Sequence, residues 1–151
     1  MKKTLFAATV LAASLMAAST VQAAPQEVTM WHYFDQKPEQ EMLADMVEEY
    51  NSLQDDIHIN ATFVSRTELM NQYTVGALSG ELPDIGQVDS PDMESYISLG
   101  VFEDITDELE SWGELDQFYD GPLSSCKDPD GKVYGLPQIV TVLHLLAIWI
   151  F

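Results

Sequence analysis

Polar and aromatic side chains come together in the stretch 28–38, VTMWHYFDQKP, where an apolar run gives way to a helix start. Trp31 and His32 lie within the run, and Asp35 ends it. Pro38 suits the first turn of a helix, where its missing N–H group costs nothing. Open α/β sheets bind ligands where a strand ends and a helix begins. These three side chains could hold a polar ligand with apolar faces; alternatively, Trp31 and His32 are core residues of a central strand.

A second polar loop, 89–92, follows another short apolar segment. Ser90 is a plausible N-cap with Pro91 at the first helical position. Asp89 and Asp92 add two carboxylates to this loop. If the two preceding strands are parallel, both loops lie at the same edge of the sheet. The sequence therefore predicts that the loops share one site.

The elements around these loops alternate between strand and helix. The spacing of apolar residues predicts strands from 28, over 57–64 and over 85–88, and helices over 38–53, from 65 to about 78 and from 90 to Gly100. This order is typical of a parallel sheet with helices on its faces. Ser65 to Glu68 fits a capping box, and His58 is expected to face solvent. The side chains expected to point inward are Met42, Leu43, Met46, Val47, Tyr50, Leu53, Ile57, Ile59, Ala61, Phe63, Leu69, Met70, Tyr73, Leu78, Met93, Tyr96 and Ile97.

The pattern is looser after residue 100. Segments 101–102 and 118–119 are expected to pack, and Thr106 is a candidate cap for a short helix through Trp112. The ring of Trp112 could stack on a sugar, although a core or interface position is favoured. Segment 128–132, DPDGK, lacks the remaining ligands of a calcium loop and is interpreted as a tight hairpin turn, with 133–137 as the returning strand.

The amino terminus has the pattern of a secretory signal peptide. Lys2 and Lys3 precede an apolar run over 5–18, and small residues favour cleavage after Ala23 or Ala24. No Cys follows the cleavage site, so a lipid anchor is not expected. The sequence predicts a soluble, exported product, most simply in a bacterial periplasm, with residues 1–24 removed.

Acidic residues dominate the remainder of the chain. Two of the six basic residues are in the signal peptide, so the rest carries four against 25 acidic residues, a net charge of −21. Such a charge repels nucleic acid and anionic lipid, and neither is expected as a partner. The single cysteine, Cys126, is either a free thiol or lacks its partner.

No motif for enzymatic chemistry stands out. The sequence has no nucleophile elbow, no phosphate loop and no metal-ligand spacing among its three histidines. An enzyme and a cofactor are therefore not expected. A glycosidase-like hydrolase is the remaining enzymatic alternative, because many carboxylates could pair by chance.

The chain resembles the amino-terminal part of a family 1 extracellular solute-binding protein of an ABC importer, of the sugar type related to maltose-binding protein. The resemblance covers roughly 27–138 and rests on an ordered set of segments: VTMWHYF, the Glu-rich helix, IHINATFV, ELPDIGQVDSPDMESYISLGVFEDIT and DGKVYGLPQ. It implies a type II periplasmic-binding-protein-like α/β fold, with 25–138 forming an incomplete N-terminal lobe: a mostly parallel sheet flanked by helices. It also implies a monomer that binds a carbohydrate between two lobes and delivers it to an ABC permease in the inner membrane.

The resemblance also implies ligand contacts at particular positions. The family's contact loops match Trp31, His32 and Asp35 after the first strand, and Asp89, Ser90 and Asp92 after the third. A further match is Gln138, just beyond Gly-Leu-Pro. Aromatic rings would cover the apolar face of a sugar, while carboxylates and amides would bind its hydroxyls.

The sequence departs from the family beyond Gln138. Segment 139–151, IVTVLHLLAIWIF, is almost wholly apolar, where the family continues with a polar segment. A helix of that length falls short of the hydrocarbon core of a bilayer, so a membrane anchor is not expected. A one-base shift of the reading frame from Gln138 could restore a family-like continuation, and a gene fragment with a natural apolar end is the alternative. The chain would then be a truncated and largely non-functional fragment; a small stand-alone interaction domain is the competing interpretation.

Overall fold

The computed structural model describes residues 24–139. The predicted signal peptide, apart from Ala24, and the predicted apolar tail with its frame shift, apart from Ile139, lie outside the described residues. The described part is built on a parallel sheet in the order β2-β1-β3. Its strands are β1 (Gln26–His32), β2 (Ile57–Phe63) and β3 (Ile85–Gly86). A mixed α/β fold with a parallel sheet flanked by helices is therefore confirmed.

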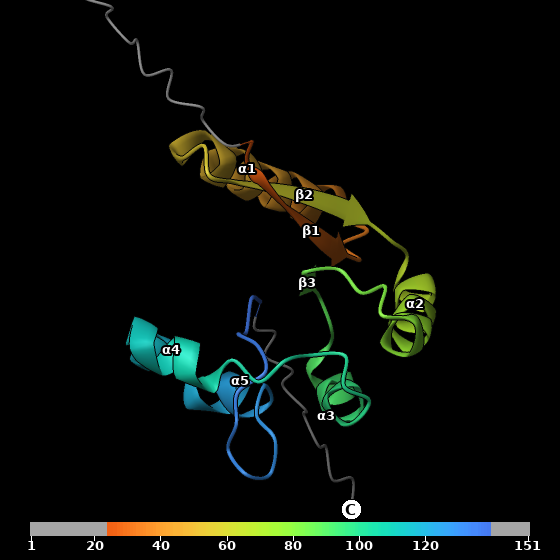
Figure 1. Ribbon diagram of the computed structural model, residues 1–151, viewed down its shortest axis with the longest axis vertical. Coiled ribbons are helices and arrows are strands. Elements are labelled where there is room, and N and C mark those ends of the chain that lie inside the picture. Colours follow the sequence, from red (N-terminus) through yellow and green to blue (C-terminus); the bar gives the residue numbers. More distant parts are fainter. Residues whose placement is uncertain (1–23, 140–151) are drawn as a thin grey trace, which may run out of the picture.

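The helices follow the strands in the predicted order. They are α1 (Lys37–Leu53), α2 (Arg66–Ser79), α3 (Ser90–Ser98), α4 (Thr106–Trp112) and α5 (Asp120–Ser124), with a 3-10 turn, η1 (Leu115–Gln117), before α5. Figure 1 shows α1 running along β1 and β2, and α3, α4 and α5 gathered on the other side of β3. The molecule thus has two parts that meet at β3.

The two neighbours of β1 pair with it to different extents. β2 pairs along the whole strand, from Gln26 with Ile57 to His32 with Phe63. β3 pairs only through Met30 with Ile85 and Trp31 with Gly86, so the predicted strand over 85–88 is shorter than expected. The short edge strand is reinforced by Asp84, whose carboxylate accepts hydrogen bonds from the backbone N–H and the hydroxyl of Thr29, each at 2.7 Å.

Successive side chains of β1 enter two different clusters, because side chains alternate along a strand. Met30 and the following Phe34 pack with Leu43 of α1. Trp31 and Tyr33 pack on the opposite side, against a cluster of Leu69 and Tyr73 of α2 and Tyr96 of α3. We call these the α1 face and the α2 face of the sheet.

Three predicted helix starts differ from the structure. Ser65 holds the N-cap position of α2, but its side chain makes no capping hydrogen bond, so the capping box is wrong. Asp89, rather than Ser90, is the N-cap of α3. In α4 the N-cap is Ile105, because the hydroxyl of Thr106 instead donates to Asp104, two residues earlier.

Several side chains expected to point inward are exposed. On α1 only Leu43 is fully buried and Val47 half-buried, because within residues 24–139 no element covers the rest of the stripe. The predicted returning strand over 133–137 is also wrong, since only an isolated bridge joins Lys127 and Val133. Its turn is confirmed, with Gly131 at a positive φ of 88°. The other exposed members of the predicted inward or packed set are Met42, Met46, Tyr50, Leu53, Phe63, Leu78 and Tyr119.

Candidate functional site

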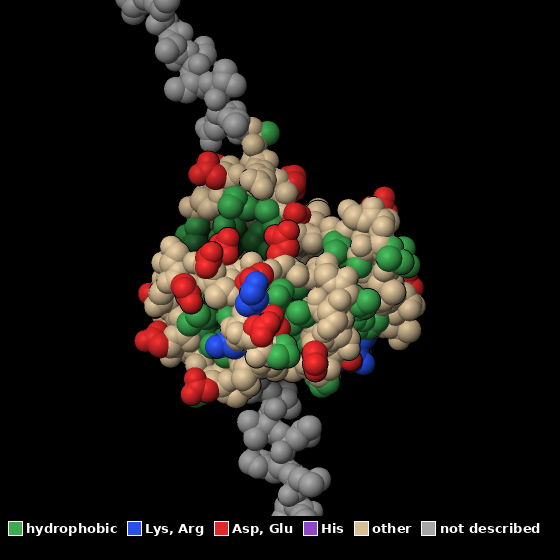
Figure 2. Space-filling model, turned by 60° about the horizontal axis from the view of Figure 1, so that its bottom comes forward, with side chains coloured by type: hydrophobic (Ala, Val, Ile, Leu, Met, Phe, Trp, Pro, Cys, Tyr) green, Lys and Arg blue, Asp and Glu red, His purple; other side chains and the backbone are tan. Residues whose placement is uncertain are grey.

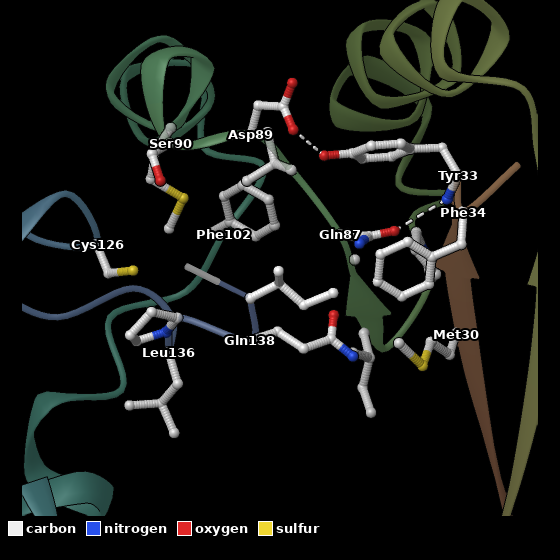
Figure 3. A pocket seen from close by; sticks show the side chains of 18 of the residues that line it. Met30, Tyr33, Phe34, Gln87, Asp89, Ser90, Phe102, Cys126, Leu136 and Gln138 are labelled. Carbon is white, nitrogen blue, oxygen red and sulfur yellow. Dashed lines mark hydrogen bonds between the residues drawn. The ribbon is translucent and has the colours of Figure 1, made fainter. Parts of the chain in front are cut away.

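A cavity of about 1760 Å³ opens at the carboxyl ends of β1 and β3. Its polar wall comes from the loops over 33–36 and 87–90, and its far wall from the segment 134–139. Figure 3 shows Tyr33 and Asp89 pointing toward each other at its upper edge, with Gln138 across the cavity. On the face drawn in Figure 2, hydrophobic side chains lie in a hollow and acidic side chains surround it. The two polar loops therefore share one edge.

The predicted ligand-binding residues divide into two groups. Asp35, Asp89, Ser90 and Gln138 line the cavity. The remaining predicted residues, Trp31, His32 and Asp92, do not line it. Trp31 packs on Tyr73 and His32 is buried beside Phe34 and Phe63, while the first turn of α3 carries Asp92 away from the cavity.

Trp31 lies on the α2 face. Its ring stacks on that of Tyr73, with centroids 6.1 Å apart. The remaining part of the ring lines a separate shallow pocket of about 390 Å³, together with Glu68 and Gln72 of α2. The half-buried ring is therefore both a packing element and part of a polar surface, but it does not face Asp89 across a common cavity.

His32 lies on the α1 face and is buried. Its ring has the rings of Phe34 and Phe63 as neighbours, each with centroids 5.9 Å away. Its Nδ1 atom is buried and has no hydrogen-bond partner among residues 24–139. Burial lowers the pKa of the imidazole below its ordinary value of 6.5. This position favours the interpretation of His32 as a core residue.

Asp89 is held by a cation and a phenol. Arg66, at the start of α2, approaches both Asp89 and Asp92 at 2.8 Å, and the hydroxyl of Tyr33 donates to Asp89. Burial and the neighbouring Asp89 carboxylate raise the pKa of Tyr33 well above its ordinary value. The phenol therefore stays protonated as a donor, and Asp89 keeps a fixed orientation toward the cavity.

Sequence analysis missed three of these residues. Arg66 lies in a segment interpreted as a capping box, and Tyr33 was assigned only to the strand. Gln87 was also missed; its side-chain oxygen accepts a hydrogen bond of 3.0 Å from the backbone N–H of Tyr33. Tyr33 and Gln87 each lie within two residues of a predicted polar loop, which was the available signal for them, whereas Arg66 is far in sequence from both loops.

The lining can bind polar groups but shows no catalytic constellation. Asp35 is exposed at the mouth and Gln138 is exposed on the far wall, while Phe34 and Phe102 supply apolar surface. Among residues 24–139, no group of three or more His, Cys, Asp or Glu side chains could hold a metal ion. In the same part of the chain, no helix combines the length and apolar character needed to cross a bilayer.

Neither a protein-family model nor a curated protein matches the sequence. Solved structures do match. The galacto-N-biose/lacto-N-biose I-binding protein of an ABC transporter from Bifidobacterium longum, in complex with lacto-N-biose, is similar to 79% of this chain, with 26% identity and a TM-score of 0.66. The chain has the fold of the ABC-transporter solute-binding proteins. This confirms the family resemblance found in the sequence.

Two further solved structures of solute-binding proteins are similar to this chain. The cyclic α-maltosyl-1,6-maltose binding protein from Arthrobacter globiformis matches 70% of the chain with 28% identity and a TM-score of 0.51. An ABC substrate-binding protein from Listeria monocytogenes in complex with cycloalternan matches 74% with 21% identity and a TM-score of 0.65, which shows the fold alone. The chain spans only 30%, 24% and 28% of these three solute-binding proteins, respectively.

Proposed function

We propose that the described part of this solute-binding protein contributes one wall of a carbohydrate site used in ABC import. The observation that carries the proposal is the similarity to an ABC-transporter protein solved in complex with lacto-N-biose. It is supported by the polar edge that carries Asp35 and Asp89, and by Gln138 on the opposite wall of the cavity. An exported, periplasmic protein that delivers the sugar to a permease is part of the same proposal.

Each polar residue has a role that suits a sugar. The carboxylate of Asp89 accepts hydrogen bonds from ligand hydroxyls, while Tyr33 and Arg66 fix its orientation. Asp35 and Gln138 offer further acceptors and donors from opposite walls. Small-molecule sites usually bury most of the ligand's surface. Because the chain spans under a third of each related protein, we expect affinity in the millimolar range, near −4 kcal/mol.

Nuclear magnetic resonance titration of the full chain with lacto-N-biose and cycloalternan tests the proposal. Saturable shifts are expected for backbone amides in loops 33–36 and 87–90. Substituting Asp89 by Asn should weaken binding at least tenfold, because hydrogen bonds to charged groups contribute about 1.5–3 kcal/mol. The matched control is Asp92→Asn, which also removes a partner of Arg66 but lies outside the cavity; it should bind like the wild type.

Two outcomes would contradict the proposal. The first is an absence of saturable shifts with either sugar at concentrations well above the expected dissociation constant. The second is equal loss of binding in Asp89→Asn and Asp92→Asn, because that result would assign the effect to Arg66 rather than to the ligand-facing carboxylate. Mass spectrometry of secreted material tests the export step, for which cleavage after Ala23 or Ala24 is expected.

A further inference from the structure

We propose that the shallow pocket between Trp31 and α2 is a second binding site, which takes a guanidinium group such as that of arginine. We call it the Trp31 pocket. It has a volume of about 390 Å³ and shares no lining residue with the large cavity. The inference therefore does not depend on sugar binding. It rests on an anchored aromatic ring, two carboxylates without a cation beside them, and the C-terminal end of a helix.

The aromatic wall of the Trp31 pocket is the half-buried indole ring of Trp31. The ring stacks on that of Tyr73, with an angle of 23° between their planes. Tyr73 is fully buried, and its hydroxyl donates a hydrogen bond of 3.0 Å to the backbone carbonyl of Gln87. Tryptophan is the ring that attracts organic cations most strongly. Because Tyr73 already holds the indole in place, stacking a cation on it costs little side-chain entropy.

The second wall is one side of α2. Side chains three and four residues apart are neighbours on a helix surface. The amide nitrogen of Gln72 donates a hydrogen bond of 3.2 Å to the carboxylate of Glu68, four residues earlier. A guanidinium carries five N–H donors in one plane, which suit carboxylate and amide oxygens on such a wall. The residues of α2 that line the pocket are Glu68, Asn71, Gln72, Val75, Gly76 and Ser79.

The turn at the end of α2 brings a second carboxylate, that of Glu81, to the Trp31 pocket. The helix ends at Gly80 in the left-handed conformation, and the N–H of Glu81 then donates to the carbonyl of Gly76 at 3.2 Å. A Cβ atom at Gly76 would lie 2.9 Å from the carbonyl oxygen of Glu81. The glycine therefore permits this close return of the chain, which places Glu81 on the same side of α2 as Gly76.

The negative charge of the Trp31 pocket is not neutralised within the described part of the chain. Its lining includes no Lys or Arg. The ion pairs among residues 24–139 are made by other carboxylates than those of Glu68 and Glu81. The C-terminal end of α2 adds a partial negative charge, and the last turn of the helix has no basic residue. The pocket therefore attracts a cation and repels an anion.

The lining favours an organic cation over a metal ion. No group of three or more metal-binding side chains occurs among residues 24–139, whereas Ca²⁺ takes about six to eight oxygen ligands. Trp31 and Val75 add apolar surface, and the side chain of Val75 is exposed. A guanidinium is weakly hydrated, stacks on aromatic rings and presents its donors at its edge, while an ammonium group is compact and strongly hydrated. The combination of ring and oxygen acceptors therefore points to guanidinium.

Nuclear magnetic resonance titration of the full chain with N-acetyl-arginine amide tests the proposal, because this probe carries one guanidinium and no other charge. The reporters are the indole N–H of Trp31, identified as the signal that Trp31→Phe removes, and the backbone amides of Gln72 and Glu81. Saturable shifts with a dissociation constant in the millimolar range are expected. N-acetyl-citrulline amide has a similar shape without the charge and should give no saturable shift. Equal shifts with both probes, or no saturable shift with the arginine probe, would overturn the proposal.

Charge substitutions separate a local site from general attraction to an acidic protein. Glu68→Gln and Glu81→Gln should each weaken binding of the arginine probe about threefold to fivefold, because each removes one exposed ion pair. The matched control is Glu110→Gln on α4, which removes the same charge from an exposed residue outside the Trp31 pocket and should bind like the wild type. Equal weakening in all three variants would assign the effect to net charge and overturn the proposal.

Two further titrations define the ligand and the independence of the site. Tighter binding of an arginine within a glycine-flanked pentapeptide than of free L-arginine would assign the guanidinium to a protein partner, and the reverse order would assign it to a small solute. A saturating concentration of lacto-N-biose should leave the binding of the arginine probe unchanged, because the two pockets share no residue. Competition between the sugar and the probe would place the probe in the large cavity and overturn the proposal.

Discussion

The two faces of β1 differ sharply in how completely they are packed. On the α2 face, Leu69 and Tyr73 are fully buried, and Tyr73 has the rings of Trp31, Tyr96 and Phe102 as neighbours. On the α1 face, only Leu43 of the apolar stripe of α1 is fully buried, and the helix lines an open cavity. The same strand therefore belongs to a closed core on one side and an open one on the other.

The difference has a topological cause. The α2 face is closed by α3 and by residues 101–102, which follow soon after β3 in the chain. The α1 face has no comparable cover within the described residues, because α4 and α5 lie beyond β3 and not over α1. An apolar stripe thus indicates which side of a helix can be buried. That side is buried only where another element of the chain packs against it.

The largest expected effect is on the closed face. Substituting Leu69 by Ala should lower the free energy of unfolding by about 2–5 kcal/mol, because a fully buried side chain leaves a cavity. Urea unfolding followed by circular dichroism measures this change. A loss below 1 kcal/mol would show that the α2 face is not the closed core described above.

A moderate effect of opposite sign is expected at His32. Substituting His32 by Leu removes a buried nitrogen without a partner and should stabilise the protein by about 1 kcal/mol at pH 7. Burial holds the folded-state pKa below the unfolded value of 6.5, so wild-type stability falls as the pH drops through this range. The advantage of the variant should therefore grow between pH 7 and pH 5, and equal pH profiles would contradict it.

A smaller effect is expected on the open face. Met46→Ala should change the free energy of unfolding by about 0.5 kcal/mol or less, because this side chain is half exposed. The comparison with Leu69→Ala is made by urea unfolding of both variants under the same conditions. A cost similar to that of Leu69→Ala would remove the contrast between the two faces.

The smallest effect is expected at Asp104, outside both faces. A hydrogen bond from Lys132, followed by one from Thr106, lowers the pKa of Asp104 to about 2. The pKa of Asp104 in the folded state lies below its ordinary value of 3.8, so the stabilisation is present above about pH 4 and is lost as the pH falls toward 2. The cost of Asp104→Asn should therefore be smaller at pH 3 than at pH 7 and should nearly vanish at pH 2, as measured by urea unfolding at the three values.

The local elements of the fold were predictable because each is encoded within a few residues. The stripe on α1, the alternation in β2 and the stop of α2 at Gly80, with φ of 76°, all depend on local spacing or backbone freedom. The length of β3 was not predictable. A Cβ atom at Gly86 would lie 2.5 Å from the hydroxyl of Tyr73, a residue thirteen positions earlier. Close approaches of this kind arise only from tertiary packing.

Sequence patterns predicted which loops form the candidate site, but not which side chains of those loops line the cavity. The parallel order placed Asp35 and Asp89 at one edge, and the structure agrees. Strand β1 ends at His32. Trp31 packs on Tyr73 and His32 is buried beside Phe34 and Phe63, so neither lines the cavity. The bond from Arg66 to Asp92 joins α2 to α3, and no local pattern in either segment indicates it.

The hydrogen bonds between Thr29 and Asp84 have a consequence for the order of folding. They join residues 55 positions apart and hold an edge strand that pairs through only two residues. Closing so long a loop is favourable only after β2 and α2 have packed, so this contact should form after the main folding barrier. Thr29→Val should therefore accelerate unfolding while leaving the refolding rate nearly unchanged in stopped-flow measurements. The hydrogen bonds between Thr29 and Asp84 would then determine the lifetime of the native state, through its unfolding rate, and not the rate at which the protein folds.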